Sequence, residues 1–253
     1  MSRRMSNGNT ETTHFGFKTV NAGEKSGLVR SVFDSVAGRY DVMNDLMSGG
    51  LHRLWKDAMI NWLRPRPGQR VLDVGGGTGD IAFRILKAGG GPVTVADINA
   101  EMLAVGQDRA LDKGIVGPID WVEADAENLP FDDCSFDTFV TAFCIRNTTH
   151  PEKVLAEAHR VLVPGGRFLC LEFSAVPSPI LSKIYDIYSF KVLPEIGARV
   201  TGDRDAYQYL AESIRKFPDA NTFAGMVNAA GLRPVKVRTM TGGVVALHSA
   251  WRI

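Results

Sequence analysis

The chain has 253 residues, of which 45% are hydrophobic and 23% are charged, and its 29 basic and 28 acidic residues leave a formal net charge of +1. This composition indicates an ordinary soluble domain with a sizeable core, and the near-neutral charge provides no overall field that would attract nucleic acid. The three cysteines and five histidines lack the spacing of a disulfide framework or a metal site, so we expect neither.

The N-terminal region is polar before it becomes helical. Residues 1–12 lack the apolar core of a secretory signal, and we expect a disordered tail there. We expect residues 13–253 to form a single domain, in which the segment 25–64 is helical. A long insertion at 176–217 contains four of the five tyrosines. No apolar run reaches the roughly 20 residues of a membrane span, which indicates a cytoplasmic protein.

Strand-like and helix-like segments alternate from Val71 onward. Strands are predicted at 70–75, 92–98, 119–125, 136–143 and 167–173, and helices at 80–88, 100–111, 149–162 and 222–231. Thr149 and Glu152 predict a capping box at the start of the third helix. Residues 234–253 are typical of two strands joined by a TGG turn. The alternation predicts an α/β fold, a parallel sheet covered by helices on both faces, to which the hairpin adds an antiparallel strand.

The sequence VLDVGGGTGD, residues 71–80, joins the first predicted strand to the first predicted helix. Its glycines, Gly75, Gly77 and Gly79, permit positive φ angles and a close approach of the backbone to a ligand. The free N–H groups at the start of the helix favour an anionic group. Taken alone, this spacing also fits a tight strand–helix turn that binds nothing.

Two acidic residues follow at the ends of the next strands. Asp97 lies about 20 residues after the glycines, where an acidic side chain accepts hydrogen bonds from ribose hydroxyls. Asp125 ends the third strand. Because ligands bind at the carboxyl ends of the strands in such sheets, we expect the glycine loop, Asp97 and Asp125 to line one adenosine-binding crevice.

The charge of this crevice distinguishes between adenosine-containing ligands. Asp73, Asp80, Asp97 and Asp125 would repel the pyrophosphate of a dinucleotide, whereas their negative potential favours the sulfonium and ammonium groups of S-adenosylmethionine. The terminal hairpin also favours a methyltransferase sheet over a dehydrogenase sheet. A nicotinamide-dependent oxidoreductase stays open as an alternative at this point.

Longer motifs narrow the interpretation. DVGGGTGD, ADIN, ADAENLPF and LVPGGRFLCLEF resemble, in order, the motifs of class I S-adenosylmethionine-dependent methyltransferases. Outside this core, YDVMNDLMSGGLHRLWK (40–56), YSFKVLPEIG (188–197), YQYLAESIRKFPD (207–219) and TGGVVALHSAWRI (241–253) resemble the UbiE/COQ5 family of quinone-ring C-methyltransferases. The resemblance covers about residues 13–253 and implies a Rossmann-like fold with a seven-stranded, mostly parallel sheet.

The resemblance also implies which residues bind the cofactor. Thr78, Asp97 and the pair Asp125–Ala126 are implied to contact S-adenosylmethionine. Their chemistry is compatible with this, because Asp97 can accept from the ribose and Asp125 from the adenine amino group, while the Ala126 N–H can donate to a ring nitrogen. We expect Asp73 to orient the glycine loop or to meet the ammonium group of the cofactor.

Two positions after the fourth strand depart from the family pattern. Relatives commonly have glycine where this chain has Cys144, whose bulkier side chain can alter the pocket. Some relatives have serine where this chain has Ala142, so that only the backbone of Ala142 can serve the cofactor. We do not expect Cys144 to act as a nucleophile, because methyl transfer needs no covalent enzyme intermediate.

The family methylates a ring carbon in ubiquinone and menaquinone biosynthesis, which implies a polyprenylated quinol substrate, 2-methoxy-6-polyprenyl-1,4-benzoquinol, demethylmenaquinol or both. Arg146 and Asn147 are the expected catalytic residues, and Arg146 would stabilise phenolate charge or order a water that takes the proton. His52 and Tyr188 are secondary candidates for contacting ring oxygens. Pairing with a surface carboxylate stays open for Arg146, and a structural role for the other two.

The N-terminal helices and the aromatic-rich insertion are expected to form a lid over an apolar tunnel for the isoprenoid tail. Any contact with the inner face of a membrane would then be peripheral, and a homodimer or a quinone-biosynthesis complex stays open. The alternatives are a methyltransferase for another small aromatic or lipid substrate, one for nucleic acid or protein, and a non-catalytic scaffold subunit. The neutral charge argues against a nucleic-acid target.

Overall fold

A mixed β-sheet forms the centre of the computed structural model, which describes residues 11–36, 40–115, 117–200 and 202–253. Within these residues, seven strands make up the sheet, in the order β5-β4-β3-β6-β7-β9-β8. Their bounds are β3 Pro67–Val74, β4 Gly91–Asp97, β5 Ile119–Glu123, β6 Phe136–Ala142, β7 Leu162–Phe173, β8 Lys236–Met240 and β9 Val245–Trp251. Strands β3 to β7 are parallel, whereas β9 is antiparallel to both β7 and β8. The predicted α/β fold with an antiparallel C-terminal hairpin is therefore confirmed.

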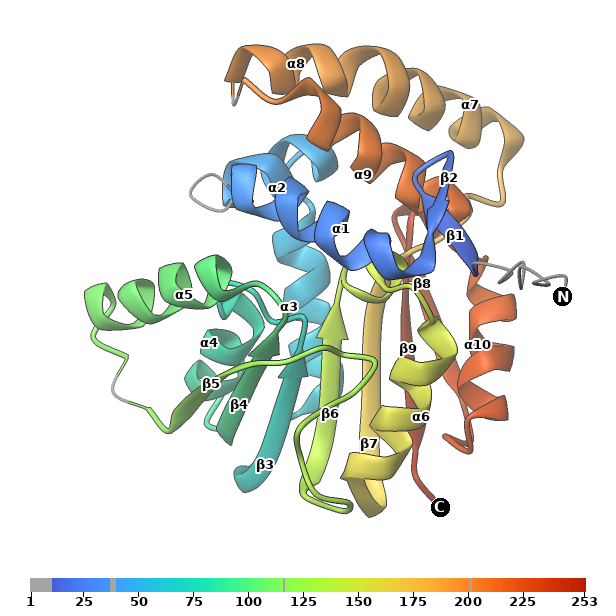
Figure 1. Ribbon diagram of the computed structural model, residues 1–253. Coiled ribbons are helices and arrows are strands. Elements are labelled where there is room, and N and C mark those ends of the chain that lie inside the picture. Colours follow the sequence, from blue (N-terminus) through green and yellow to red (C-terminus); the bar gives the residue numbers. More distant parts are fainter. Residues whose placement is uncertain (1–10, 37–39, 116, 201) are drawn as a thin grey trace, which may run out of the picture.

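Helices cover both faces of the sheet (Figure 1). Their bounds are α1 Ala22–Val36, α2 Tyr40–Ser48, α3 His52–Leu63, α4 Asp80–Lys87, α5 Ala100–Asp112, α6 Pro151–Val161 and α10 Ala220–Ala229. Val71 of β3 belongs to the buried cluster that includes residues of α3 and α4, whereas its neighbour Leu72 belongs to the cluster that includes residues of α6 and α10. Because both faces of the central strands are buried, neighbouring apolar residues there point to opposite faces of the sheet.

The start of α6 differs from the prediction. The helix begins at Pro151, its N-cap is His150, and no side chain caps it. The backbone N–H groups of Thr149 and His150 instead donate to Oε1 of Glu127, at 2.6 and 2.9 Å. The predicted capping box of Thr149 and Glu152 is therefore wrong. Proline fits the first helical position best, which sets the helix start one residue later than the box requires.

A short hairpin, which the sequence pattern did not predict, precedes α1. It consists of β1 Thr12–Phe15 and β2 Lys18–Asn21. Phe15 stacks on Tyr209 with ring centroids 4.2 Å apart, and the Phe17 N–H donates to Glu212 at 2.9 Å. Four-residue strands give too short a pattern to recognise in the sequence. The residues against which the hairpin packs, Tyr209 and Glu212, lie almost 200 residues further along the chain. Residues 1–10 of the predicted disordered tail lie outside the described residues.

A helical layer lies above the carboxyl ends of the strands (Figure 1). Besides α1 and α2 it contains α7 Pro179–Ile187, a π-helical turn at Tyr188–Val192, α8 Leu193–Val200 and α9 Arg204–Lys216. Helix α8 packs against both α2 and α9. The insertion therefore joins the N-terminal helices in covering the edge of the sheet where the glycine loop lies.

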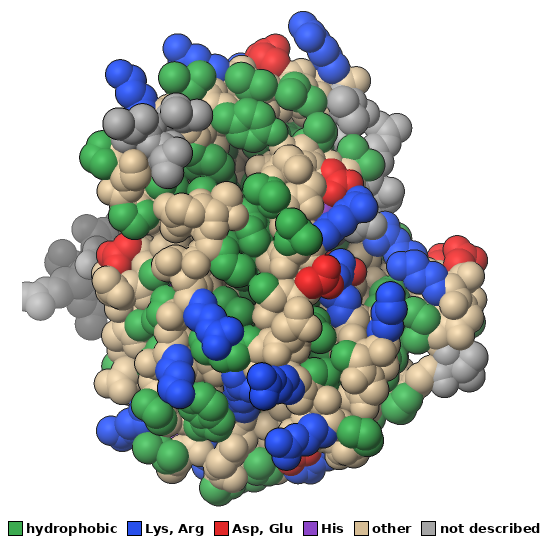
Figure 2. Space-filling view, turned by 180° about the vertical axis from the view of Figure 1, so that it is seen from behind, with side chains coloured by type: hydrophobic (Ala, Val, Ile, Leu, Met, Phe, Trp, Pro, Cys, Tyr) green, Lys and Arg blue, Asp and Glu red, His purple; other side chains and the backbone are tan. Residues whose placement is uncertain are grey.

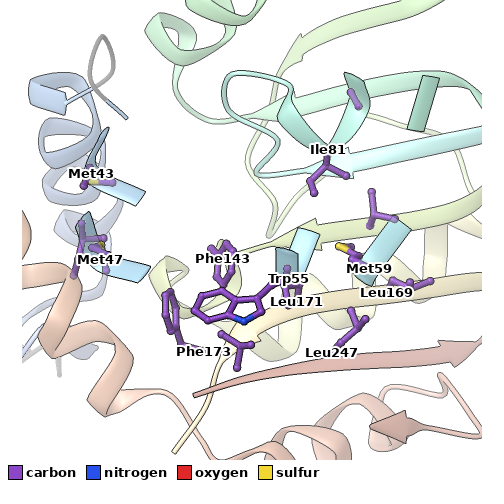
Figure 3. Close-up of a cluster of buried hydrophobic side chains, with 14 of the residues drawn as sticks. Met43, Met47, Trp55, Met59, Ile81, Phe143, Leu169, Leu171, Phe173 and Leu247 are labelled. Carbon is purple, nitrogen blue, oxygen red and sulfur yellow. The ribbon is translucent and has the colours of Figure 1, made fainter. Parts of the chain in front are cut away.

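An aromatic cluster fixes α3 to this edge (Figure 3). Trp55 lies close to the rings of Phe143 and Phe173, with centroid distances of 6.3 and 6.1 Å. Its indole N–H donates to Oγ1 of Thr241 at 2.8 Å, so the ring is both buried and hydrogen-bonded. Such a buried, bonded indole holds a helix in one register against the sheet.

Lysine and arginine side chains are spread over the lower part of the face in Figure 2, with few acidic side chains among them.

At the β8 edge of the sheet, cations lie over tryptophan rings. The Arg238 guanidinium lies 4.2 Å from the Trp62 centroid, and Lys236 lies 5.8 Å from that of Trp251. Exposed charges of this kind discourage an edge strand from pairing with another chain.

Candidate functional site

The glycine loop joins β3 to α4 at the carboxyl edge of the sheet. Gly75 and Gly79 have φ angles of +64° and +78°, which favour glycine. A Cβ atom on Gly75 would collide with Sγ of Cys144, and one on Gly79 would lie 2.6 Å from the Trp121 ring. Gly75 thus permits a close approach of two loops, while Gly79 permits packing of Trp121 against the start of α4.

Asp97, the last residue of β4, organises this loop. One carboxylate oxygen accepts from the Gly77 N–H and the other from the Asn99 N–H, both at 2.9 Å. Burial raises the pKa of Asp97 to about 6, although these backbone donors act in the opposite direction. The carboxylate also lines a cavity, so it is placed to bind a ligand as well as the loop.

This cavity has a volume of about 380 Å³ and lies between the sheet edge and α1. The predicted site residues that line it are Gly75, Gly77, Asp97, Asp125, Ala126 and Asn147. Asp125 accepts from the Glu127 N–H at 2.9 Å, which turns the chain around the cavity after β5. The volume is within the usual range for small-molecule sites.

A second, narrower cavity of about 30 Å³ adjoins the first, since Gly75 and Gly77 line both. The predicted residues Asp73, Thr78 and Ala142 line it. Thr78 is buried, and its hydroxyl accepts from Arg109 at 3.1 Å. This cavity has room only for the polar end of a ligand.

Asp73 is the least compensated carboxylate of the site. It is 1% exposed, and neither of its oxygens forms a well-aligned hydrogen bond within the described residues. Burial raises its pKa to about 7, against the opposing effects of Lys56 and the Ala82 N–H. A cationic group in the second cavity would relieve this desolvation.

Asp80 contributes less negative potential than its sequence position suggested. Its carboxylate accepts from Lys56 at 2.9 Å and from Arg84 at 3.2 Å. Burial acts to raise its pKa, but these two cations keep it below its ordinary value. The negative character of the site therefore comes from Asp73, Asp97 and Asp125 rather than from Asp80.

The chain turns sharply after β6. Phe143 has a φ angle of +58°, which is rare for a non-glycine residue, and Cys144 follows it against Gly75. Both residues line the larger cavity. Burial raises the pKa of the Cys144 thiol far above its ordinary value, so the side chain acts as a neutral wall. It occupies space that a glycine would leave open.

Arg146 and Asn147 form the 3₁₀ turn that follows. The Arg146 guanidinium is absent from the described walls of both cavities and pairs with the buried carboxylate of Glu172 at 2.9 Å. It also donates to the Phe143 carbonyl and lies 5.3 Å from the Phe173 ring centroid. Asn147 lines the larger cavity and accepts from the Tyr209 hydroxyl at 3.2 Å.

His52 and Tyr188 are absent from the described walls of these two cavities. His52 is buried at the start of α3, where Nε2 lies 2.8 Å from Asp45. Burial lowers its pKa, against the effect of that carboxylate. The Tyr188 hydroxyl donates to the Leu46 carbonyl. His52 thus ties α3 to α2, and Tyr188 ties the π-helical turn to α2.

Residues of α1 and α3 were missed by the sequence reasoning. Lys25 of α1 donates to the Thr148 carbonyl at 2.6 Å, and Arg30 donates to the Ile98 carbonyl, so α1 is bonded across the larger cavity. Lys56 of α3 lines the smaller cavity. A lysine in an amphipathic helix is usually solvated, and only the packing of α3 reveals that this one is buried.

The two cavities fit a ligand that has an adenosine part at one end and, at the other, a sulfonium cation followed by a zwitterionic amino acid. Asp97 and Asp125 offer acceptors in the larger cavity, and Asp73 offers an unpaired carboxylate in the smaller one. A pyrophosphate would meet the same carboxylates with its own negative charge. The described residues contain no group of three or more His, Cys, Asp or Glu side chains placed to hold a metal ion.

Relatives with known names share most of the chain. It is 58% identical over 243 residues to the ubiquinone/menaquinone biosynthesis C-methyltransferase UbiE of Brucella abortus (strain S19). The matched region covers 94% of this chain and 90% of that protein. The protein of the same name from Brucella anthropi is also 58% identical and is covered to 92%.

Solved structures share the fold at low sequence identity. A SAM-dependent methyltransferase from Aquifex aeolicus is 18% identical with a TM-score of 0.62, over 84% of this chain and 98% of that one. A phosphoethanolamine N-methyltransferase 2 from Haemonchus contortus, in complex with S-adenosyl-L-methionine, has a TM-score of 0.58 over 78% of this chain and 52% of that one, again at 18% identity. The model of the ubiE/COQ5 methyltransferase family matches residues 19–252. The chain therefore belongs to the ubiE/COQ5 methyltransferase family.

Proposed function

We propose that this protein transfers the methyl group of S-adenosylmethionine to a ring carbon of a polyprenylated quinol in ubiquinone or menaquinone biosynthesis. The observation that carries the proposal is the 58% identity, over 94% of the chain, to relatives named ubiquinone/menaquinone biosynthesis C-methyltransferase. The acceptor is 2-methoxy-6-polyprenyl-1,4-benzoquinol, demethylmenaquinol or both. Another small aromatic or lipid acceptor is the second candidate, because the residues of the cofactor cavities do not distinguish one methyl acceptor from another.

The two adjoining cavities would hold the cofactor. In the larger one Asp97 would accept from the ribose, and Asp125 and Ala126 would meet the adenine. The amino-acid end would lie in the smaller one, beyond Gly75 and Gly77, which line both cavities. Thr78 and the Ala142 backbone line that end of the site.

The reaction is a direct displacement. A ring carbon of the quinol attacks the sulfonium methyl, so that a carbon–carbon bond forms, the methyl–sulfur bond breaks and S-adenosylhomocysteine leaves. The ring carbon is nucleophilic when a neighbouring hydroxyl has lost its proton to water. After the transfer the ring carbon loses its own proton and the ring oxygen is protonated again, so that one proton passes to water overall. The protein's tasks are to align the ring with the methyl group and to stabilise phenolate charge.

Arg146 and Asn147 are the proposed catalytic pair. Asn147 lines the larger cavity, and its side-chain amide would donate to a ring oxygen there. Arg146 lies behind it in a buried ion pair with Glu172, and this pair positions the turn that carries Asn147. His52 and Tyr188 lie outside the two cavities and support the covering helices in this proposal, rather than the ring.

Peripheral contact with the inner face of a membrane fits the covering layer. Its outermost helices expose Ile187 and Val192 together with Lys183, Lys191 and Arg199. Apolar and basic side chains in one surface suit an anionic bilayer, from which a polyprenyl tail would enter. No helix in the described ranges is long and apolar enough to cross a membrane. A homodimer or a complex with other enzymes stays a prediction.

The decisive experiment is mass spectrometry of the quinones from cells that lack this protein. Accumulation of a ring-demethylated quinone that disappears when the wild-type gene is restored would support the proposal and identify the acceptor. Complementation with Asp97→Asn should fail, whereas Asp120→Asn, which changes an exposed carboxylate on the neighbouring strand, should succeed. An unchanged quinone profile in the deletion strain would contradict the proposed pathway.

A further inference from the structure

Lys56 is a buried cation beside the glycine loop. The residue is 5% exposed, and its Nζ donates to Asp80 at 2.9 Å while lining the smaller cavity. Lysine is rarely buried unless it is paired, because desolvating an ammonium group is unfavourable. Its position is fixed by its neighbour Trp55, which anchors α3 between two aromatic rings and Thr241.

Asp73 supplies the opposite charge in the same cavity. It is as deeply buried as Lys56, and its oxygens lack well-aligned hydrogen bonds within the described part of the chain. Asp80, by contrast, already accepts from Arg84 as well as from Lys56, so Lys56 can share its ammonium protons with a further acceptor. The cavity thus presents one ammonium group that can donate a further hydrogen bond and one carboxyl group with no well-aligned side-chain donor among the described residues.

These charges complement a zwitterion that enters from the larger cavity. We propose that Lys56 binds the α-carboxylate of the cofactor's amino-acid end, beside the ammonium group that Asp73 is already expected to meet. The inference rests on the proposed function, since it assumes that the larger cavity holds the adenosine. It adds a residue from α3, which lies outside the α/β alternation, to the cofactor site.

A purely structural role makes a different prediction. If Lys56 only ties α3 to α4 through Asp80, its loss loosens the site for every adenosine ligand alike. If it binds the carboxylate, its loss weakens only those ligands that carry one. Truncated ligands therefore separate the two roles.

Calorimetric titration of the full chain with three ligands makes this comparison. S-adenosylhomocysteine carries both the carboxylate and the ammonium group, decarboxylated S-adenosylmethionine carries only the ammonium group, and 5′-methylthioadenosine carries neither. Lys56→Met should lower the affinity for S-adenosylhomocysteine about 10- to 100-fold, the usual range for a hydrogen bond between charged groups. The affinities for the other two ligands should stay within about twofold. Asp73→Asn should lower the affinities for S-adenosylhomocysteine and decarboxylated S-adenosylmethionine and leave that for 5′-methylthioadenosine unchanged.

Two further variants make the test robust. Lys56→Gln retains a donor for Asp80, so it guards against a folding defect and should give the same pattern of affinities. Lys87→Met, at the exposed end of α4, is the matched control and should change none of the three. Equal loss of all three ligands in both Lys56 variants, or undiminished S-adenosylhomocysteine binding, would overturn the assignment of Lys56. Failure of the wild-type chain to bind any of the three would overturn the proposed cofactor site itself.

Discussion

The guanidinium of Arg146 and the carboxylate of Glu172 form an ion pair of 2.9 Å in which the two side chains are only 4% and 1% exposed. Glu172 accepts in addition from the Phe173 N–H at 2.9 Å, and Arg146 donates to the Phe143 carbonyl. Burial raises the pKa of Glu172, and the charge of Arg146 opposes that shift. The pair therefore holds the turn after β6 to the end of β7, directly behind the larger cavity.

Breaking this pair from one side should destabilise the protein strongly. Glu172→Gln leaves the Arg146 charge buried without its partner, and we expect a loss of about 3 to 5 kcal/mol in the free energy of unfolding. Urea unfolding followed by circular dichroism measures this loss. Glu123→Gln breaks an exposed pair with Arg30 and should cost less than about 1 kcal/mol. Similar losses in the two variants would contradict the burial of the Arg146–Glu172 pair.

Removing both partners should separate stability from catalysis. In the variant Arg146→Met/Glu172→Leu, apolar side chains of similar volume replace the pair, and we expect stability close to that of the wild type. Turnover should fall at least about 100-fold while cofactor affinity stays nearly unchanged, because the guanidinium lies outside the described walls of the cofactor cavities. Turnover and calorimetry on the same preparation test both statements. Full turnover in the double variant would remove Arg146 from the mechanism.

Asp97→Asn should abolish measurable binding of S-adenosylhomocysteine. The carboxylate lines the larger cavity and also accepts from the N–H groups of Gly77 and Asn99, so one substitution affects both the ribose contact and the shape of the loop. Calorimetry gives the affinity, and Asp120→Asn serves as the exposed control. Unchanged affinity in Asp97→Asn would contradict the placement of the ribose.

The positions of the strands could be predicted from the sequence because a buried parallel strand is a short apolar run that ends in a turn. Asp97 could be placed at the sheet edge for the same reason, since the end of a strand is visible in the pattern. The ion-pair partner of Arg146 could not be predicted from the sequence, because Glu172 lies 26 residues further along the chain, at the end of the neighbouring strand β7. Lys56 was invisible for a related reason, as the rotation of α3 about its axis depends on packing around Trp55.

Cys144 and Gly75 should show compensating substitutions. Gly75→Ala places a Cβ atom against Sγ of Cys144 and adds the strain of a left-handed backbone, so we expect cofactor affinity to fall at least about tenfold. Cys144→Gly in the same chain removes the collision and should restore most of that affinity, leaving strain of about 1 to 2 kcal/mol in stability. The matched control is Gly89→Ala, where φ is +81° and nothing lies within 4 Å, so only strain is added. Absence of any rescue by Cys144→Gly would show that the two loops do not meet as described.

Asp73 should make the cofactor-free protein less stable as the pH rises. Its pKa is about 7 in the folded protein, against 3.8 for an ordinary aspartate, so the folded state binds the extra proton between these values, and stability falls as the pH increases through that window. Asp73→Asn removes this dependence. The stability of the variant relative to the wild type should therefore rise by about 3 kcal/mol between pH 5 and pH 8, whatever constant effect the amide has.

Thermal unfolding at both pH values, with and without S-adenosylhomocysteine, measures the effect of Asp73→Asn. The ammonium group of the ligand should hold the wild-type Asp73 carboxylate ionised, so that the pH dependence flattens in the wild type when the ligand is present. Parallel pH profiles of variant and wild type without ligand would show that the Asp73 carboxylate does not titrate in this window. The same substitution thus favours the empty protein increasingly as the pH rises, while it weakens cofactor binding, as expected where a site keeps a buried charge for its ligand.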